Sequence, residues 1–239
     1  MIGLRRRRSP EPAPPRPAPG TRLYAIGDIH GRYDLLRALM EILAEDAAGF
    51  DDDRQACAVF LGDYIDRGDQ SREVLAYIEL LEAGAHAVFL KGNHEAALLH
   101  FLDDPEAGAG WLDIGGQQTL ASYGIPPIAA AAAPAELRRA ARELRAAMGS
   151  HVGVLERMGM VFRSGSVVCA HAGLDPRASP ERQGEAALLW GRSDFLAAGG
   201  VPGLRVVHGH WAGHDVVVTP GRICVDTGAY HTGRLAAVR

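Results

Sequence analysis

The stretch 61–68 reads L-G-D-Y-I-D-R-G and directly follows an apolar run at residues 57–61. Asp63 leaves the end of a predicted buried strand, where its carboxylate oxygens are free to bind a cation. Asp66 and Arg67 follow within one turn of chain, beside any group that the cation holds. This stretch therefore predicts a metal site with further charged groups next to it.

Similar side chains follow other predicted strands. In open α/β sheets, ligands bind beyond the carboxyl ends of the strands. Mixed carboxylate, imidazole and carboxamide ligands suit Mn, Fe or Zn better than an all-oxygen calcium site. With two metals, Asp63 is the predicted bridging ligand, and a bridging water becomes a hydroxide nucleophile near neutral pH. Six strand ends supply such residues: Asp28 and His30, Asp63 and Asp66, Asn93 and His94, His171, His208 and His210, and Asp226.

The pattern is specific only when its parts are taken together. Alone, Asp28 could cap a helix and His30 could be a turn residue. Three glycine-flanked motifs beginning at residues 27, 62 and 92, each after a predicted strand, make a chance assembly negligible. The other histidines are predicted to be surface or core residues without a site role: His86, His100, His151, His214 and His231.

Strands and helices that alternate must position these residues. Strands are predicted at 22–27, 56–61 and 86–90, each followed by a loop and a segment with helical spacing of apolar residues. This order predicts βαβ units and a largely parallel sheet. Further strands are predicted at 166–170, 204–207, 216–219 and 222–225. Residues 105–160 are predicted to be a helical insertion or cap that borders the substrate cleft.

Composition limits the other possibilities. The 239 residues carry a net charge of −4, and the first 19 carry +4, which leaves −8 on the remainder. An acidic body predicts no nucleic-acid partner. Residues 1–20, rich in proline and arginine, are predicted to be a disordered tail before one domain at 21–239. No apolar run reaches the ~20 residues of a membrane span, and three dispersed cysteines predict reduced thiols in a cytoplasmic protein. The oligomeric state is left open.

These motifs resemble those of the phosphoprotein phosphatase family of metallophosphoesterases, in particular its small bacterial serine/threonine protein phosphatases. The resemblance rests on G-D-I-H-G at 27–31, G-D-Y-I-D-R-G at 62–68, G-N-H-E at 92–95 and H-A-G at 171–173. V-V-H-G-H at 206–210 and V-D-T-G-A at 225–229 extend it. The resemblance implies a four-layer α/β/β/α fold with a central pair of mixed sheets.

The resemblance also implies two divalent metal ions, with Mn as the first choice and Fe or Zn as alternatives. It implies that Asp28, His30 and Asp63 hold one ion. The second ion would be held by four residues, with His208 as the alternative to the last of them: Asp63, Asn93, His171 and His210. Asp226 would lie behind the ligands or be structural.

Roles in catalysis are implied in the same way. His94 would be the general acid that protonates the leaving oxygen, and Asp66 would hold its other ring nitrogen. Arg67 and Arg192 would grip the phosphate, with Asn93 beside them. Tyr230 falls where related enzymes place a loop tyrosine over the site.

The predicted function is a metal-dependent phosphomonoesterase that acts on phosphoserine or phosphothreonine in proteins, with phosphotyrosine or a small phosphate ester as further substrates. Attack would be direct, by a metal-bridging hydroxide. The alternative is a bis(nucleosyl)-tetraphosphatase, whose relatives typically lack the second aspartate of the central motif and end the third motif in aspartate. Asp66 and Glu95 therefore favour the protein phosphatase. A phosphoprotein-binding scaffold without activity would need a missing ligand or acid, and none is missing.

Overall fold

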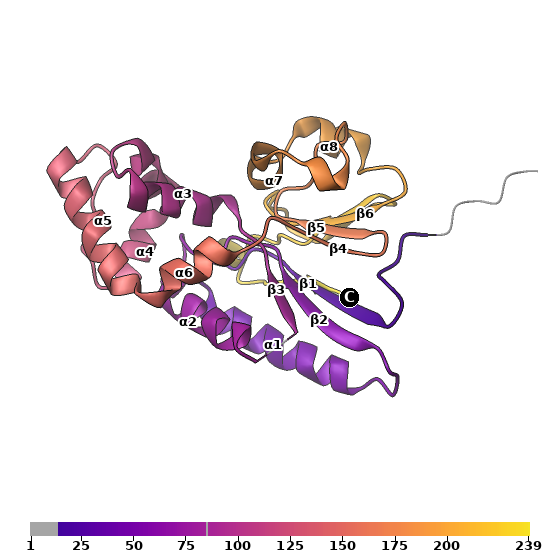
Figure 1. Cartoon of the computed structure of the whole chain (residues 1–239). Helices are drawn as coiled ribbons and strands as arrows, with labels where there is room; N and C mark the ends of the chain where they lie inside the picture. The colour runs from indigo at the N-terminus through magenta and orange to yellow at the C-terminus, as the bar shows by residue number, and fades with distance from the viewer. Residues whose placement is uncertain (1–13, 85) are drawn as a thin grey trace, which may run out of the picture.

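The computed structural model describes residues 14–84 and 86–239, and two sheets lie face to face at its centre (Figure 1). The first sheet contains β1 (Thr21–Ile26), β2 (Gln55–Phe60), β3 (Ala87–Phe89) and β9 (Ala237–Val238) in the order β3-β2-β1-β9. β1, β2 and β3 are parallel, and β9 is antiparallel to β1. The sequence predicted the three parallel strands but not β9, which is only two residues long.

The second sheet is also mixed. It contains β4 (Val161–Ser164), β5 (Val167–Ala170), β6 (Arg205–His208), β7 (Val217–Val218) and β8 (Arg222–Cys224) in the order β4-β5-β6-β8-β7. β5, β6 and β8 are parallel, whereas β4 and β7 are antiparallel to their neighbours. The sequence predicted all of these strands except β4.

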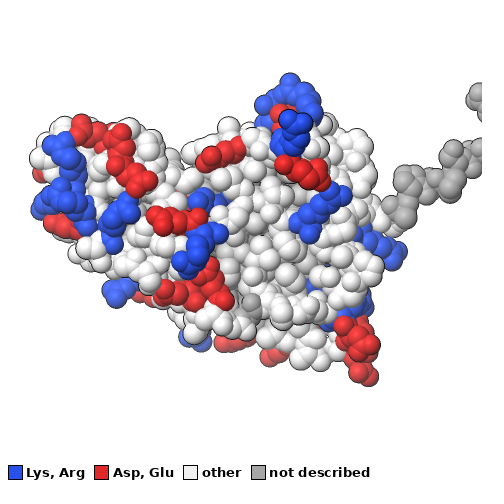
Figure 2. All heavy atoms as spheres, viewed as in Figure 1, with Lys and Arg blue, Asp and Glu red and all other residues white. Residues whose placement is uncertain are grey.

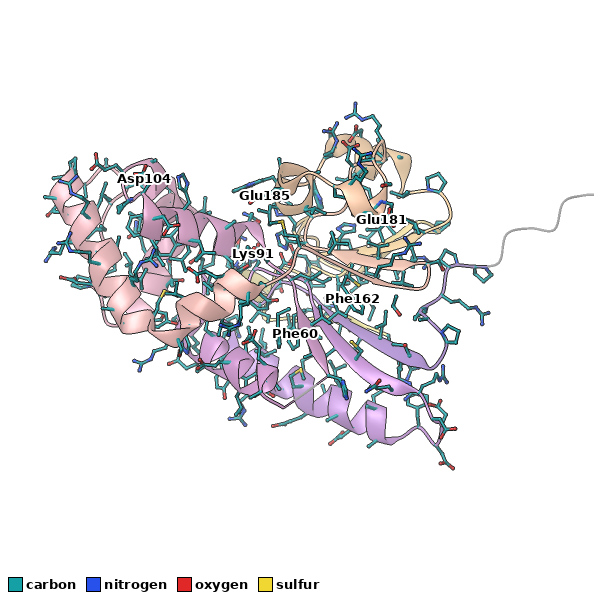
Figure 3. The ribbon with its side chains drawn as sticks, viewed as in Figure 1. Phe60, Lys91, Asp104, Phe162, Glu181 and Glu185 are labelled. Atoms are coloured by element: carbon teal, nitrogen blue, oxygen red, sulfur yellow. The ribbon has the colours of Figure 1, made fainter. Side chains whose placement is uncertain are left out.

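Helices cover the two outer faces. α1 (Tyr33–Ala48) and α2 (Ser71–Glu82) lie on the first sheet, and α7 (Glu185–Trp190) and α8 (Ser193–Ala198) lie on the second (Figure 1). Phe60 packs into the helix-facing core of the first sheet, while Phe162 packs between the sheets (Figure 3). Successive residues of one strand, such as Val168 and Cys169, point to different layers. The four-layer α/β/β/α fold is confirmed.

A helical lobe follows α3 (Asn93–Asp103) and lies beyond the carboxyl ends of the first sheet (Figure 1). It contains η1 (Ala107–Ile114), α4 (Gly116–Ser122), α5 (Pro134–Met148) and α6 (Ser150–Arg157). α5 buries one face through Leu137, Leu144 and Met148 and leaves its arginines outside. The lobe therefore shares the main core rather than forming a separate one. Two short helices lie in loops of the second half of the chain. η2 (Pro180–Arg182) lies beside β4, where Glu181 pairs with Arg163, and α9 (Ala229–Thr232) lies near His30.

The predicted tail falls mainly on residues 1–13, which lie outside the described residues. The following segment contacts the β4–β5 turn. The Arg16 N–H donates to Ser166 Oγ (2.7 Å), the Ser166 N–H donates to the Arg16 carbonyl (3.0 Å), and the Ala18 N–H donates to Ser164 Oγ (3.0 Å). These hydrogen bonds fix residues 16–18 on the second sheet, in contrast to the disorder predicted for all of 1–20.

Two further expectations concern the cysteines and the possibility of a membrane span. Cys57, Cys169 and Cys224 are free thiols, as predicted. Among the helices in the described ranges, each is too short or too polar to cross a bilayer.

Candidate metal centre and catalytic residues

Loops at the carboxyl ends of β1, β2, β3, β5 and β6 bring the predicted site residues together. Close approach of these loops requires glycine. Gly62 has a φ of 106°, and a Cβ there would lie 2.6 Å from the Gly92 nitrogen. A Cβ on Gly92 would overlap the carboxylate of Asp63. The glycines of the sequence motifs thus allow the two loops to pack side by side.

Five non-glycine residues of the described chain have a left-handed backbone, and every one is a predicted site residue: His30, Asp63, Asp66, Arg67 and His210. Such a conformation is uncommon outside glycine and costs about 1–3 kcal/mol at each position. Surrounding hydrogen bonds hold the strained backbone, for example from the N–H groups of Ile29 and His30 to the Asp63 carbonyl (3.0 and 2.9 Å). The folded scaffold therefore fixes the orientation of these side chains.

Two groups of potential metal ligands share Asp63. The first contains His30, Asp63 and His94, and the second contains Asp63, His171 and His210, with the ligand atoms of each group within 4.8 Å of one another. Asp63 Oδ2 lies 3.5 Å from His30 Nε2, and Asp63 Oδ1 lies 3.4 Å from His171 Nε2. One carboxylate thus presents one oxygen to each group, which is the arrangement expected of a bridging ligand.

The orientation of the donor atoms tests whether a cation fits the second group. His171 Nδ1 donates to the Leu61 carbonyl (2.9 Å), so Nε2 carries a lone pair. That lone pair faces Asn93 Oδ1 at 2.9 Å and Asp63 Oδ1 at 3.4 Å. His210 Nδ1 lies 3.0 Å from the same Asn93 oxygen. Buried acceptors turned toward one another repel unless a cation lies among them, so these residues fit a divalent metal ion.

Asp28 is buried beside these groups but is not a member of either. Its carboxylate accepts from the backbone N–H of His210 (3.0 Å). Burial, together with the charges of Asp226 and Asp63, raises the pKa of Asp28 well above its ordinary value. A bound cation would favour the ionised form. The Asp226 carboxylate accepts from the backbone N–H of Gly228 (2.8 Å), a contact that suits the predicted position behind the metal ligands.

His94 and Asp66 form a buried pair. His94 Nδ1 lies 2.7 Å from Asp66 Oδ2, and His94 Nε2 faces Asp63 Oδ2 at 3.9 Å. The helical lobe completes the surroundings of Asp66, because Trp111 Nε1 donates to Oδ2 (2.8 Å) and the Thr119 hydroxyl donates to Oδ1 (2.6 Å). Sequence reasoning assigned no chemistry to Trp111 or Thr119. Neither residue stands out in the sequence, since Thr119 directly follows two glutamines.

The imidazoles of His94, His30 and His210 differ in pKa because burial and nearby charges act on them differently. Burial alone would lower the pKa of His94, but the negative charges of Asp63 and Asp66 outweigh it and place that pKa above its ordinary value. Burial lowers the pKa of His30 to about 3 and that of His210 to about 4. At neutral pH the latter two are therefore neutral and can offer lone pairs, whereas His94 more readily carries a proton.

Glu95 is a structural residue rather than a site residue. It is fully buried, and its carboxylate accepts from the backbone N–H groups of Asp63 (2.9 Å), Tyr64 (2.8 Å) and Gly92 (2.8 Å). Burial, with the charge of Asp63 added, raises the pKa of Glu95 to about 7. The side chain therefore ties the second and third motif loops together.

The two arginines differ in position. Arg67 Nη1 donates to His30 Nε2 (3.0 Å), so its guanidinium lies at the first ligand group. Arg192 instead donates to both carboxylate oxygens of Asp194 (2.9 Å each), and no contact joins it to the ligand groups. Tyr230 lies over the site, with its ring 5.5 Å from that of His30 and 5.0 Å from the Arg67 guanidinium carbon.

The alternative ligand His208 is turned away. Its Nδ1 faces the Gly209 carbonyl (3.0 Å), and Arg222 Nη1 lies 3.3 Å from its Nε2. The five histidines predicted to lack a site role also lie outside the two ligand groups found among the described residues.

A four-layer fold with two adjoining metal-ligand groups at its strand ends defines a metal-dependent phosphoesterase. A family model, the calcineurin-like phosphoesterase, matches residues 21–227, and the chain belongs to that family. Members typically bind a dinuclear divalent metal centre, for which this chain has candidate ligands. The predicted resemblance to metallophosphoesterases is confirmed.

Curated relatives carry a different activity from the one predicted. A protein of Methylococcus capsulatus named symmetrical bis(5'-nucleosyl)-tetraphosphatase is 30% identical over an alignment 265 residues long, gaps included, which covers 91% of each chain. A protein of Xanthomonas euvesicatoria pv. vesicatoria with the same name is 27% identical over an alignment of 270 positions, which covers 91% of this chain and 80% of that protein. A crystal structure described as a putative diadenosine tetraphosphatase shares the fold, with a TM-score of 0.62 and 20% identity, and the match covers 93% and 90% of the two chains.

The prediction of a serine/threonine protein phosphatase that acts on phosphorylated proteins is therefore wrong. These relatives, aligned over nearly the whole chain, are named tetraphosphatases. The prediction relied on Asp66 and Glu95 as markers of the substrate. Both side chains are completely buried and bond only to the protein around them, so neither can contact the group that distinguishes a phosphoprotein from a dinucleotide.

Proposed function

We propose that the chain hydrolyses bis(5'-nucleosyl) tetraphosphates at the central anhydride, which gives two nucleoside diphosphates. The observation that carries this proposal is the alignment with symmetrical tetraphosphatases over 91% of the chain, at up to 30% identity among the relatives described above. The family model matches residues 21–227, which include the strand ends from Asp28 to Asp226, so the family likeness extends to the candidate site and not only to the core.

The ligand groups support a dinuclear centre. We propose that His30, Asp63 and Asp28 hold one divalent cation, and that Asp63 shares the second with three further residues: Asn93, His171 and His210. Nitrogen and oxygen donors of this kind suit Mn first, and Fe or Zn next. When bound, the cations supply Lewis-acid activation of water and neutralise charge on the phosphates.

The protein's own residues would then orient the polyphosphate and transfer one proton. Arg67 lies beside His30, where its guanidinium can donate to phosphate oxygens, and Arg192 would do so after exchanging its contact with Asp194. Asp66 holds His94 by Nδ1, which leaves Nε2 facing the site. His94 would give that proton to the leaving diphosphate oxygen as the anhydride breaks.

The experiment is product analysis after complete metal exchange. The full chain is treated with a chelator, reloaded with Mn²⁺ and incubated with diadenosine tetraphosphate in water enriched in ¹⁸O. We expect adenosine diphosphate as the sole nucleotide product, with one ¹⁸O for every two molecules formed. A mixture of adenosine monophosphate and triphosphate would show asymmetric cleavage and contradict the proposal.

A matched variant separates this activity from a contaminant. Asn93→Ala removes the oxygen that faces both His171 and His210, so the same preparation should lose activity with its fold intact. Circular dichroism checks the fold. Equal turnover by Asn93→Ala and the natural chain would show that the activity does not arise at this site.

A further inference from the structure

Two of the large apolar side chains exposed on the described part of the chain are aromatic, and both lie beside the metal-ligand groups. Trp190 is 51% exposed and Tyr230 is 39% exposed. The Tyr230 ring lies 5.5 Å from that of His30, and the Trp190 ring lies 6.4 Å from that of His210. Each aromatic thus borders a different ligand group. An exposed ring at such a place offers a face on which a planar part of a substrate can stack.

A groove leads away from the site on the Trp190 side. It lies between α3 and α7 and has a volume of about 530 Å³. The molecular surface is notched between the helical lobe and the α7–α8 layer, and Glu185 lies on the side of α7 toward α3 (Figures 2 and 3). Its lining includes two alanines of α3, two apolar residues of α7 and two polar residues: Ala96, Ala97, Leu189, Trp190, His100 and Glu185.

The two helices order these residues by distance from the metal centre. α3 begins with the site residues Asn93 and His94, and His100 lies six residues further, about 9 Å along the helix. α7 ends at Trp190 near His210 and begins at Glu185. The groove is therefore aromatic and apolar near the phosphates and polar at its far end. A nucleoside attached to a diphosphate has the same order of groups and a comparable length.

We propose that this groove binds one nucleoside of the dinucleoside substrate, with the base stacked on Trp190 above Ala96 and Ala97. The proposal rests on the proposed function, which places the phosphates at the metal centre. The polar edge of the base points toward His100 and Glu185. The Glu185 carboxylate accepts from the exocyclic amino group of adenine, whereas it opposes the carbonyl oxygen of uracil. The groove therefore selects adenine over uracil.

The test compares substrates with and without a base in the Mn²⁺-loaded full chain. For Trp190→Ala, kcat/KM for diadenosine tetraphosphate should fall about 5- to 150-fold, the effect of losing one base–aromatic stack. The Ki of inorganic tetraphosphate, which has the same phosphate chain without nucleosides, should change less than twofold. Trp190→Phe should restore most of the loss because it keeps an aromatic face. Glu185→Ala should narrow the preference for diadenosine over diuridine tetraphosphate.

Leu80→Ala is the matched control, since Leu80 is a large apolar residue that is 68% exposed on α2. Leu80→Ala should leave the ratio of kcat/KM for diadenosine tetraphosphate to the Ki of inorganic tetraphosphate unchanged. A Trp190→Ala ratio within twofold of the natural chain would overturn the nucleoside site while leaving the tetraphosphatase activity standing.

A binding measurement tests the nucleoside site independently of hydrolysis. Adenosine diphosphate should quench the tryptophan fluorescence of the natural chain. Trp211 is partly buried and its ring lies 5.3 Å from that of His210, so the contribution of Trp190 is measured in a Trp211→Phe background. There the quenching should disappear when Trp190→Phe is added, because Trp111 is buried in the core. If diadenosine tetraphosphate is not hydrolysed but the Trp190-dependent quenching occurs, the proposed function is wrong and the nucleoside site stands. Absence of quenching in the natural chain would overturn the nucleoside site without any variant.

Discussion

Replacing Thr119 by valine tests whether the helical lobe holds His94 and Asp66, the proposed catalytic pair, in place. Valine keeps the shape of the side chain and removes only the hydroxyl. Thr119 is fully buried, and its hydroxyl donates to Asp66 Oδ1 (2.6 Å) while its oxygen accepts from the Asp66 N–H (3.0 Å). The N–H keeps a second acceptor in Ser71 Oγ (3.0 Å), whereas Oδ1 loses its donor.

The loss of stability follows from that difference. A hydrogen bond to a charged group contributes about 1.5–3 kcal/mol, and a buried carboxylate oxygen left without its donor is at the upper part of this range. We expect the free energy of unfolding to fall by about 2–3 kcal/mol, which lowers Tm by about 4–12 °C in a domain of this size. The kcat should also fall, because Asp66 no longer has a fixed position against His94. KM should change little, since the Thr119 side chain bonds to Asp66 and Ser71 and not to Arg67, the proposed phosphate-binding residue.

Urea unfolding of the metal-free chain gives the free energy, and turnover of diadenosine tetraphosphate gives kcat. Ser122→Ala is the control within the same helix, because its hydroxyl donates only to the Thr119 carbonyl (2.8 Å) and is partly exposed. The reasoning is refuted if Thr119→Val lies within about 0.5 kcal/mol of the control, well below the expected loss, and has the natural kcat.

Three further predictions concern the same centre. In Asp66→Asn, the alkaline fall of kcat should move to lower pH, because the carboxylate favours protonated His94 and the pKa of His94 falls without it; an unshifted alkaline limb would contradict this. In His94→Asn, kcat should fall at least ~10²-fold for phenyl phosphate, whose leaving group has a pKa of about 10, and less for diadenosine tetraphosphate, whose leaving phosphate has a pKa of about 6; equal losses would exclude the role of general acid. Mn²⁺ at about 100 times its Kd should raise Tm of the chelated chain at pH 7 by about 5–11 °C. The rise should be smaller near pH 4, because His210, with its pKa of about 4, is then partly protonated and binds the cation less well. A rise in Tm that does not depend on pH would count against imidazole ligands.

The strand ends were the part of the site that sequence reasoning could find. Asp63, His171 and His210 each follow an apolar run, and the carboxyl ends of parallel strands meet at one edge. The same reasoning could not give side-chain orientation. Arg192 follows the expected motif, yet its guanidinium lies on Asp194, two residues away. Asp28 follows its strand as predicted, and its carboxylate also accepts from the His210 backbone N–H, a contact that the sequence does not show.

Other features left no readable pattern in the sequence. β9 is only two residues long, and pairing with β1 rather than local propensity makes it a strand. β4 contains Val161 and Phe162, which favour a strand, but it directly follows the predicted helical insertion and was passed over. Thr119 lies in a helical segment far along the chain from Asp66, and only the tertiary fold shows that the two bond. Glu95 was visible but misread as a substrate marker, because the sequence does not show that its carboxylate is spent on three backbone N–H groups.

The pairing of β9 with β1 has a consequence for how the protein reaches its folded state. Ile26 pairs with Ala237, and the Gly27 N–H donates to the Ala236 carbonyl (3.1 Å), directly before Asp28. The loop that carries Asp28 and His30 follows β1. During synthesis, β1 can therefore pair with β9, its second neighbour, only after almost the whole chain has been made. Contacts so distant in sequence form slowly, and until then β1 presents an open edge. A growing chain on the ribosome would thus acquire its metal centre late, after most of both sheets has been made.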